Sequence, residues 1–348
     1  MLEKRFIMTP FELGITTFAE VGKDPITDET PTYDERLRRL LEEMTTTEEV
    51  GLDFYGVGEH HRADFAASAP AVILAAGASI TKRIKLGSSV SVLSSDDPVR
   101  LYQQFATLQA LSNGRAELTA GRGSFIESFP LFGYDLQDYD SLYDEKLRLL
   151  VNIRDNEIST HSGTHRPSYY KLGIYPRNVE PFTIGVAVGG TPTSVIRAGK
   201  LGLPLFIAII GGEPLRFKRL VDLYRETYLD AGHDPEKMFI SIHSHGYIDE
   251  DQAKAEREYF PSISILMSRI GRERGWGPYT LETFKHAISP QGALYVGTPE
   301  YVAQKIQMLK DELGIQRFTL HVPVGPLPHD KVLQTIRLLG THVKPLIK

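Results

Sequence analysis

The sequence contains no cysteine among its 348 residues, which excludes disulfide bonds and thiol chemistry but does not fix a cellular compartment. It also lacks any run or stripe of basic residues. The formal net charge is −5, with acidic and basic residues interspersed along the whole chain. We therefore expect neither nucleic acid nor an anionic membrane surface among its partners.

Long hydrophobic runs are missing as well. The most apolar helical stretch, "APAVILAAGASI" at 69–80, is too short to span a bilayer. The opening segment "MLEKRFIMTPFELG" has no apolar stretch of the kind that a secretory signal contains. With 41% hydrophobic and 24% charged residues, the composition is ordinary for a globular chain with a full core. We expect a cytoplasmic protein.

Short apolar segments alternate with amphipathic helical segments along the entire chain. For example, "YDERLRRLLEEM" at 33–44 places its leucines and Met44 on one helical face. Each of the apolar segments is typical of a β-strand and is followed by a helical segment. The eight strand-like segments span residues 11–18, 54–60, 84–93, 115–123, 182–190, 204–212, 238–248 and 317–325.

Eight strand–helix units of this kind need crossover connections and therefore parallel strands. Their number favours an α/β fold of the closed (β/α)₈ TIM-barrel type over an open doubly wound sheet, which stays the alternative. We expect one domain over residues 1–348 with two insertions, at about 157–181 and about 250–316. The second lies before the eighth strand, contains at least two helices and is the candidate lid over a site.

Active sites of such barrels lie at the C-terminal ends of the strands, where "GVGEHH" closes the second segment. Because side chains alternate along a strand, we expect one of His60 and His61 to face the mouth and the other to face away. This weakens joint metal binding by the pair. The alternative is ordinary polar surface at a strand end.

Two histidines of the seventh segment, His243 and His245, have a better spacing for a metal because positions i and i+2 share a face. Together with His60 they suggest a rival function, a metal-dependent barrel hydrolase. Such a site recruits further ligands from other strand ends. The third, fifth and sixth segments end in "SVSVL", "VAVGG" and "AIIGG" and supply none. We therefore assign no metal site and leave both residues as mouth-lining histidines.

Glycine-rich loops after the fourth and fifth segments indicate a phosphate-bearing ligand. The loop "VGGTPTS" at 188–194 lets the backbone approach a ligand and places hydroxyl groups at a helix N-terminus, where free N–H groups favour phosphate. The loop "AGRG" at 120–123 adds the guanidinium of Arg122. The alternative is that Thr191 merely caps the helix, with Pro192 in the first turn.

Taken together, these segments resemble the bacterial-luciferase-like flavin monooxygenases. The resemblance runs in order over nearly the whole chain and rests on four segments. They are "GVGEHHRADF", "IKLGSSVSVLSSDDPVRLYQQFATLQALSNGRAELTAGRG", "GGTPTSVIRAGKLGLPLFIA" and "LPHDKVLQTIRLLG". The resemblance implies a barrel that binds reduced FMN at the strand C-termini, or a deazaflavin as the alternative cofactor.

The resemblance also implies roles for single residues. Arg122 would bind the FMN phosphate together with Gly190, Thr191 and Ser194. Val90 would lie under the flavin ring, where the family often has a cis peptide bond without proline. In this chain that bond would join Ser89 to Val90.

His60 matches the histidine that the luciferases use in catalysis, and its ordinary pKa suits an acid or base near neutral pH. Glu59 would either orient His60 or serve as a salt-bridge partner. Gly121, beside the flavin, stands where the luciferase has a reactive cysteine, and Ser94 replaces the usual proline. Light emission is therefore not expected.

The resulting expectation is a monooxygenase that uses O₂ and reduced FMN to oxygenate a small organic substrate, with an aldehyde as the first candidate. A separate NAD(P)H-dependent flavin reductase would supply the reduced FMN. A homodimer is expected, with the apolar 69–80 helix as one candidate interface. A flavin-binding protein without turnover is a further alternative beside the metal-dependent hydrolase.

Overall fold

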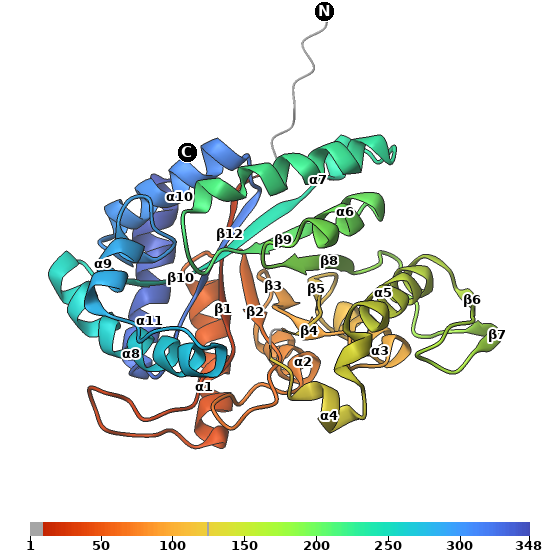
Figure 1. Ribbon diagram of the computed structural model, residues 1–348, viewed down its shortest axis with the longest axis horizontal. Coiled ribbons are helices and arrows are strands. Elements are labelled where there is room, and N and C mark those ends of the chain that lie inside the picture. The colour runs from red at the N-terminus through yellow and green to blue at the C-terminus, as the bar shows by residue number, and fades with distance from the viewer. Residues whose placement is uncertain (1–9, 124) are drawn as a thin grey trace, which may run out of the picture.

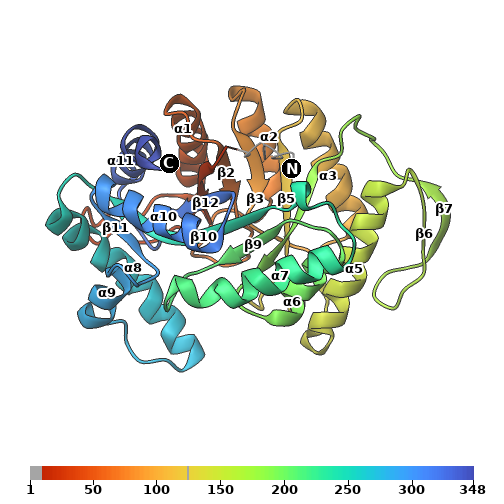
Figure 2. The same ribbon diagram turned by 90° about the horizontal axis from the view of Figure 1, so that it is seen from above.

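Parallel strands form the centre of the molecule and helices surround them, as the computed structural model shows (Figures 1 and 2). It describes residues 10–123 and 125–348. The first nine residues, to which the expectation of no secretory signal refers, lie outside this part. Within it, no helix is both long enough and apolar enough to cross a membrane.

Eight of the strands close into a barrel. They are β1 (Glu12–Thr17), β2 (Phe54–Val57), β3 (Lys85–Ser88), β5 (Ala116–Gly121), β8 (Thr183–Val188), β9 (Leu205–Ala208), β10 (Ile240–Ile248) and β12 (Arg317–His321). Strand β10 pairs in parallel with both β9 and β12, and β12 pairs with β1, so the ring has no free edge. The two-residue strand β4 (Ser91–Val92) pairs with the end of β5. The predicted (β/α)₈ barrel is confirmed, and the open sheet is wrong.

Helices cover the outside of the barrel, and their starts follow the sequence signals. Thr32 and Glu35 form a capping box at the start of α1, and Asp97 caps α3 ahead of Pro98. The helices of the ring are α1 (Tyr33–Glu49), α2 (Pro70–Ile80), α3 (Pro98–Leu111), α5 (Tyr139–Asp155), α6 (Pro192–Lys200), α7 (Lys218–Asp230), α10 (Pro299–Leu313) and α11 (His329–Leu338).

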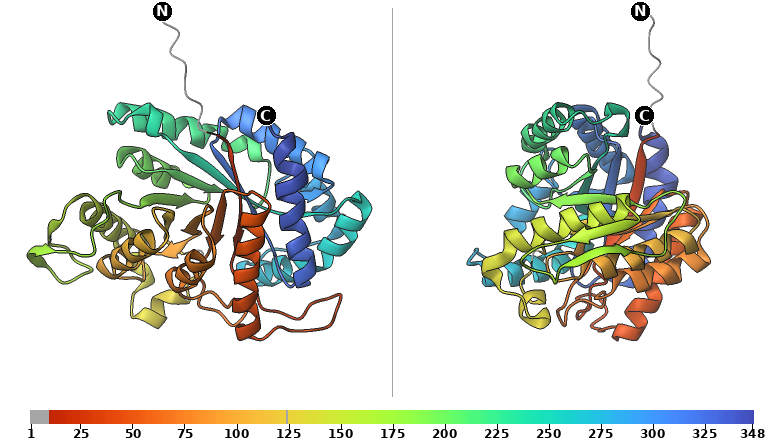
Figure 3. Two further views of the ribbon diagram at one scale, coloured as in Figure 1. Left: turned by 180° about the vertical axis from the view of Figure 1, so that it is seen from behind. Right: turned by 90° about the vertical axis from the view of Figure 1, so that its right-hand side faces the viewer.

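Two excursions leave this ring. Strands β6 (Ile158–His161) and β7 (Tyr169–Gly173) form an antiparallel hairpin that projects beyond α5 (Figure 3). Between β10 and β12 the chain forms α8 (Gln252–Arg274), α9 (Leu281–Ile288) and β11 (Tyr295–Gly297) ahead of α10. A short helix, α4 (Ser128–Phe132), follows β5. Helices α8 and α9 have a small core of their own around Tyr259 and Phe284.

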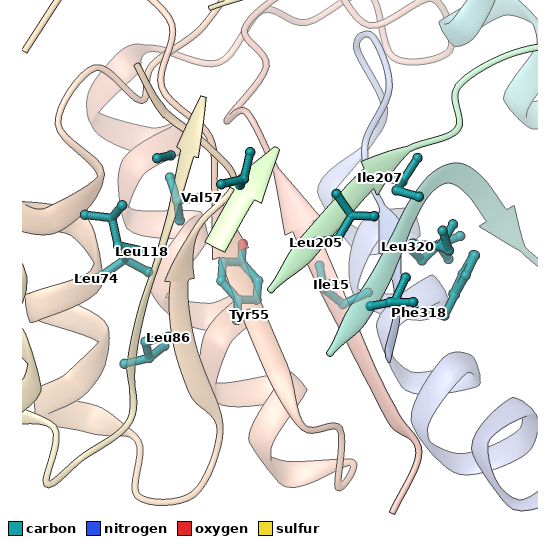
Figure 4. Packing of buried hydrophobic residues seen from close by; sticks show 14 of the residues in the cluster. Ile15, Tyr55, Val57, Leu74, Leu86, Leu118, Leu205, Ile207, Phe318 and Leu320 are labelled. Carbon is teal, nitrogen blue, oxygen red and sulfur yellow. The ribbon is translucent and has the colours of Figure 1, made fainter. Parts of the chain in front are cut away.

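The pleat of the strands divides their side chains into two sets. Outward-facing residues such as Ile15, Leu118 and Leu320 pack with the helices in the main core (Figure 4). Inward-facing residues fill the barrel in layers, as in other closed barrels of eight strands. In the middle layer, a Cβ on Gly87 would collide with the ring of Phe54, and a Cβ on Gly14 with the backbone oxygen and Cβ of the same residue. Glycine is therefore required where an aromatic ring fills the barrel.

The lowest layer is a buried ion cluster. Arg317, which is fully buried, donates to both carboxylate oxygens of Glu117 at 2.6 and 2.8 Å and to Glu12 at 2.7 Å. Its guanidinium lies 4.3 Å from the ring centre of Phe54. Burial alone would raise the pKa of Glu117, but the charge of Arg317 outweighs burial and holds that pKa below its ordinary value.

Replacing Glu117 by Gln should therefore lower the free energy of unfolding at pH 7 by about 3–5 kcal/mol, because Arg317 loses a buried partner. The lowered pKa of Glu117 means that its stabilisation is complete above about pH 4.3 and is lost as pH falls further. Urea unfolding at pH 7 and at pH 3 measures both effects. The control is Glu226→Gln on the exposed face of α7. Equal losses in the two variants would contradict the account.

Candidate active site

Strand β2 ends within "GVGEHH", and the loop that follows carries Glu59, His60 and His61 at the mouth of the barrel. Its two histidines have different surroundings, as the alternation of side chains predicts. The imidazole of His61 contacts Glu59, with 2.7 Å between Nε2 and Oε1. The imidazole of His60 packs among Phe18, Phe65 and Phe125, with ring centres 4.4, 4.4 and 5.1 Å away. The two histidines therefore do not act as one ligand pair.

His60 is held as a neutral imidazole. Its side chain is buried and its Nε2 atom has no hydrogen-bond partner in the described structure. Burial, assisted by the nearby His321, lowers the pKa of His60 to about 3. The expectation that His60 titrates near neutral pH is wrong, because the sequence does not reveal three phenylalanines around it.

Glu59 does not orient His60. One carboxylate oxygen contacts His61, and the other accepts the backbone N–H of Val92 at 2.9 Å. The backbone N–H of Glu59 donates to the carbonyl of Val90, also at 2.9 Å. Of the two expected roles the first is wrong and the second fits, with His61 as the partner. Glu59 also anchors the backbone at two points of the segment from Val90 to Val92.

This anchored segment begins at the cis peptide bond between Ser89 and Val90 that the resemblance implies. The Val90 side chain lies against Gly121 so closely that a Cβ on Gly121 would overlap it. A Cβ on Gly58 would likewise collide with Phe18 and with the carbonyl oxygen of Ser89. Glycine at these two positions therefore leaves the room that the Ser89–Val90 backbone and side chain occupy.

The loop before α6 is open and has unused hydrogen-bonding groups. Thr191 is the N-cap residue and Pro192 follows, but the Thr191 side chain makes no capping hydrogen bond in the described structure. A Cβ on Gly189 or Gly190 would meet nothing within 4 Å. Ser194 lies buried in the first turn. The alternative that Thr191 merely caps the helix is therefore not what the structure shows.

Two arginines lie near this loop, although the sequence pointed to only one. Arg122 forms an ion pair with Asp140 at 2.6 Å, and Asp140 itself is mostly exposed. Arg197, one turn after Ser194, pairs through Nε with Asp144 at 2.9 Å. Its buried Nη1 has no partner within the described structure. The sequence could have indicated Arg197, because it follows Ser194 by three residues and therefore lies on the same helix face.

The surroundings of Tyr143 place the two arginines relative to each other. Burial raises the pKa of this phenol, and the charges of Arg197 and Arg122 oppose the rise. The guanidinium of Arg197 lies 5.4 Å from the Tyr143 ring centre. An open glycine loop, unused hydroxyl groups and two guanidinium groups fit the phosphate of a flavin.

Inside the mouth, the predicted His243 and His245 lie beside His321, which the sequence did not single out. The three ring centres are 5.1 to 6.0 Å apart. Burial, followed by the neighbouring His321, lowers the pKa of both His243 and His245 well below the ordinary value. Across residues 10–123 and 125–348, no group of three or more His, Asp or Glu is arranged to hold a metal ion.

A cleft of about 280 Å³ opens next to these groups. The loop after β1 and helix α8 form its walls, and Phe65, which packs on His60, lines it. From α8, Ile265 and Leu266 contribute apolar side chains and Arg269 contributes a guanidinium group. The excursion expected to act as a lid thus contributes one wall of the cleft through α8.

Comparison with known proteins agrees with this geometry. The chain is 24% identical over 326 residues to the alkanal monooxygenase alpha chain of Aliivibrio fischeri, covering 86% of this chain and 90% of the relative. It is 26% identical over 320 residues to the F420-dependent glucose-6-phosphate dehydrogenase of Amycolatopsis mediterranei (strain U-32), covering 89% and 87%.

Among solved structures, the oxygenating constituent of 3,6-diketocamphane monooxygenase from Pseudomonas putida, determined in complex with FMN, superposes with a TM-score of 0.77. It shares 19% identity, with 97% of this chain and 99% of that chain covered. This likeness supports the fold. The model of the family described as luciferase-like monooxygenase matches residues 11–317. The chain therefore belongs to the luciferase-like monooxygenase family.

Proposed function

We propose that the protein is a flavin-dependent monooxygenase that oxygenates a small organic substrate, with an aldehyde as the first candidate. The observation that carries the proposal is the open loop at Gly189 and Gly190 with Arg122 and Arg197 nearby, a set of donors suited to a phosphate. The segment at Val90 would support the flavin ring. When bound, reduced FMN supplies the electrons that activate O₂.

The chain's own residues would bind and shield the reacting groups. Arg122, Arg197, Gly190, Thr191 and Ser194 would hold the phosphate. Phe18, Phe65 and Phe125 would exclude water around His60, whose neutral imidazole would hydrogen-bond to the substrate through the unpartnered Nε2. Since a side chain on Gly121 would overlap Val90, no cysteine fits there, and we propose that the reaction emits no light.

Anaerobic titration with FMN, reduced FMN and deazaflavin F420 tests this function. Tight binding of reduced FMN, followed by O₂ consumption that an aldehyde stimulates, is the expected result. Tight binding of F420 alone would favour the second candidate, a deazaflavin-dependent oxidoreductase, which the similarity to the F420-dependent dehydrogenase suggests. Binding without turnover would indicate a flavin-binding protein. Absence of affinity for all three would overturn the proposal.

We further propose a partner enzyme, a cellular compartment and an oligomeric state. A separate NAD(P)H-dependent reductase would supply the reduced FMN, and the cytoplasm would be the site of action. Helix α2 exposes Val72 and Ile80, at 68% and 47% of their surfaces, and Leu111 at the end of α3 is exposed as well. We propose that these helices form the interface of a homodimer.

For Arg122→Ala, we expect FMN to bind about 10- to 100-fold more weakly, because a charge-assisted hydrogen bond to phosphate is lost. Asp140→Asn should bind FMN a few-fold more tightly, because the carboxylate that competes for Arg122 is neutralised. Calorimetric titration measures both changes. The control is Arg337→Ala, an exposed arginine on α11. Unchanged affinity in Arg122→Ala would remove this residue from the site.

The variant His60→Ala should lower kcat at least about tenfold while FMN affinity stays the same. Since the pKa of His60 is about 3, the imidazole is neutral from pH 5 to pH 9. The midpoints of the pH–rate profile should therefore not move. Steady-state rates from pH 5 to pH 9 measure this, with the exposed His286→Ala on α9 as the control. Wild-type turnover in His60→Ala would exclude a catalytic role for His60.

The dimer proposal predicts that Val72→Glu, a charge placed at the exposed face of α2, gives a monomer that keeps its fold. Sedimentation velocity with circular dichroism measures both properties. Leu229→Glu, an exposed position on α7, is the control for a charge placed on an exposed helix face elsewhere. A wild-type protein that sediments as a monomer, or a Val72→Glu variant that stays dimeric, would contradict this interface.

A further inference from the structure

A line of three hydrogen bonds crosses the top layer of the barrel interior. Glu20 contacts His321, with 2.8 Å between Oε1 and Nε2. The other ring nitrogen of His321, Nδ1, lies 3.2 Å from the hydroxyl oxygen of Thr16. The same hydroxyl lies 3.0 Å from Nδ1 of His243. Four side chains are thus joined in the order Glu20, His321, Thr16, His243, which we call the mouth relay.

Strand register explains how these residues meet. Thr16 of β1 lies directly beside His321 of β12, and His243 of β10 lies beside Thr319 on the other side of β12. Residues of the same parity share the inner face of a strand, so Thr16, His243 and His321 all point inward. Glu20 follows β1 and turns back over the rim. The relay is therefore built into the closed barrel.

The chemistry of the hydroxyl group fixes a direction. The hydroxyl of Thr16 has one proton, so it donates to one imidazole and must accept from the other. If His321 donates from Nδ1, then Thr16 donates to His243, and His243 carries its own proton on Nε2. A proton that enters at His321 can then move along the two existing hydrogen bonds to His243, which releases its own Nε2 proton.

The contact with Glu20 distinguishes His321 from the other imidazoles of the top layer. Glu20 and His321 are both buried, and Glu20 also accepts from Thr17 at 3.3 Å. The imidazoles of His60, His243 and His245 face His321, and burial keeps all three neutral near pH 7. Of these four imidazoles, His321 is the one in contact with a carboxylate in the described structure. Glu20 also interacts electrostatically with Arg36 and with Tyr259.

The relay ends beside the groups assigned to flavin and substrate. His243, at the end of the relay, is partly exposed, and its ring centre lies 6.5 Å from that of Phe18. The ring of Phe18 contacts both His321 and His60, at 4.3 and 4.4 Å between centres. Phe18 also lies against Gly58, next to the carbonyl of Ser89. One phenylalanine ring therefore separates His321 from the segment that contains Val90, and Glu20 lines the cleft.

We propose that the mouth relay stores a proton between Glu20 and His321 and delivers it through Thr16 and His243 to an oxygen atom of the bound substrate. This inference rests on the proposed function, because it assigns the proton donor of that same site. His321 gives its Nδ1 proton to Thr16, Thr16 gives its proton to Nδ1 of His243, and His243 releases its Nε2 proton to the substrate oxygen. The relay loses one proton, which solvent restores after product release.

The decisive variant is Thr16→Val, which removes the hydroxyl and keeps the shape of the side chain. Thr16→Ser keeps the hydroxyl and should restore the relay. Thr119→Val is the matched control, because Thr119 is also a buried barrel threonine and its hydroxyl has no partner in the described structure. All three variants are expected to retain the fold.

The first readout is ¹⁵N NMR of the imidazoles at pH 7 without flavin, assigned with His321→Gln and His243→Gln. We expect His321 to carry protons on both nitrogens and His243 on Nε2 alone. In Thr16→Val the resonances of both should shift, while Thr16→Ser and Thr119→Val should resemble the wild type. A neutral His321, or resonances that Thr16→Val does not change, would overturn the proposal even if flavin binding failed.

The second readout is the oxidation of bound reduced FMN by O₂ with a long-chain saturated aldehyde, from pH 5 to pH 9. We expect Thr16→Val to lower kcat at least about tenfold and to change the pH profile, while the affinity for reduced FMN stays within about threefold of the wild-type value. Thr16→Ser should recover the wild-type profile. Wild-type rates and an unchanged pH profile in Thr16→Val would contradict the relay.

Discussion

The pairing of β10 with both β9 and β12 closes the sheet, and the rest of the structure depends on that closure. A closed ring of parallel strands has one inner face and one outer face. Because side chains alternate along each strand, residues of different chemical type occupy the two faces. Apolar residues on the outer face hold the helices. The inner face stacks an ion cluster around Arg317, a layer of rings and glycines, and a top layer of histidines.

The same closure brings loops that are distant in the sequence together at the mouth of the barrel. The mouth has two regions that differ in charge and in burial. Toward α5 and α6 the groups are cationic and open, with Arg122, Arg197 and the glycine loop able to receive a phosphate. Around His60 the surroundings are aromatic, and burial keeps its imidazole neutral. A phosphate-bearing flavin would extend from the first environment to the second. In our account the proton comes from a third place, the top layer of the barrel itself.

The sequence predicted the features that local pattern determines, including the eight strand–helix units and the glycine loop ahead of α6. The resemblance added the cis bond between Ser89 and Val90. Neither the sequence pattern nor the resemblance predicted the contacts that depend on the register between distant strands. Thr16, His243 and His321 meet only because β1, β10 and β12 are neighbours. The pKa of His60 depends on three phenylalanines from three loops, and the sequence does not show that Glu59 serves Val92 and His61 instead.

Comparing the affinity of reduced FMN with that of reduced riboflavin tests the central claim most directly, because the two ligands share the ring and differ by the phosphate. If the Gly189–Ser194 loop and the two arginines bind the phosphate, reduced FMN should bind at least about a hundredfold more tightly than reduced riboflavin. Equal affinity for the two ligands would contradict the account, because the ring alone would then hold the cofactor.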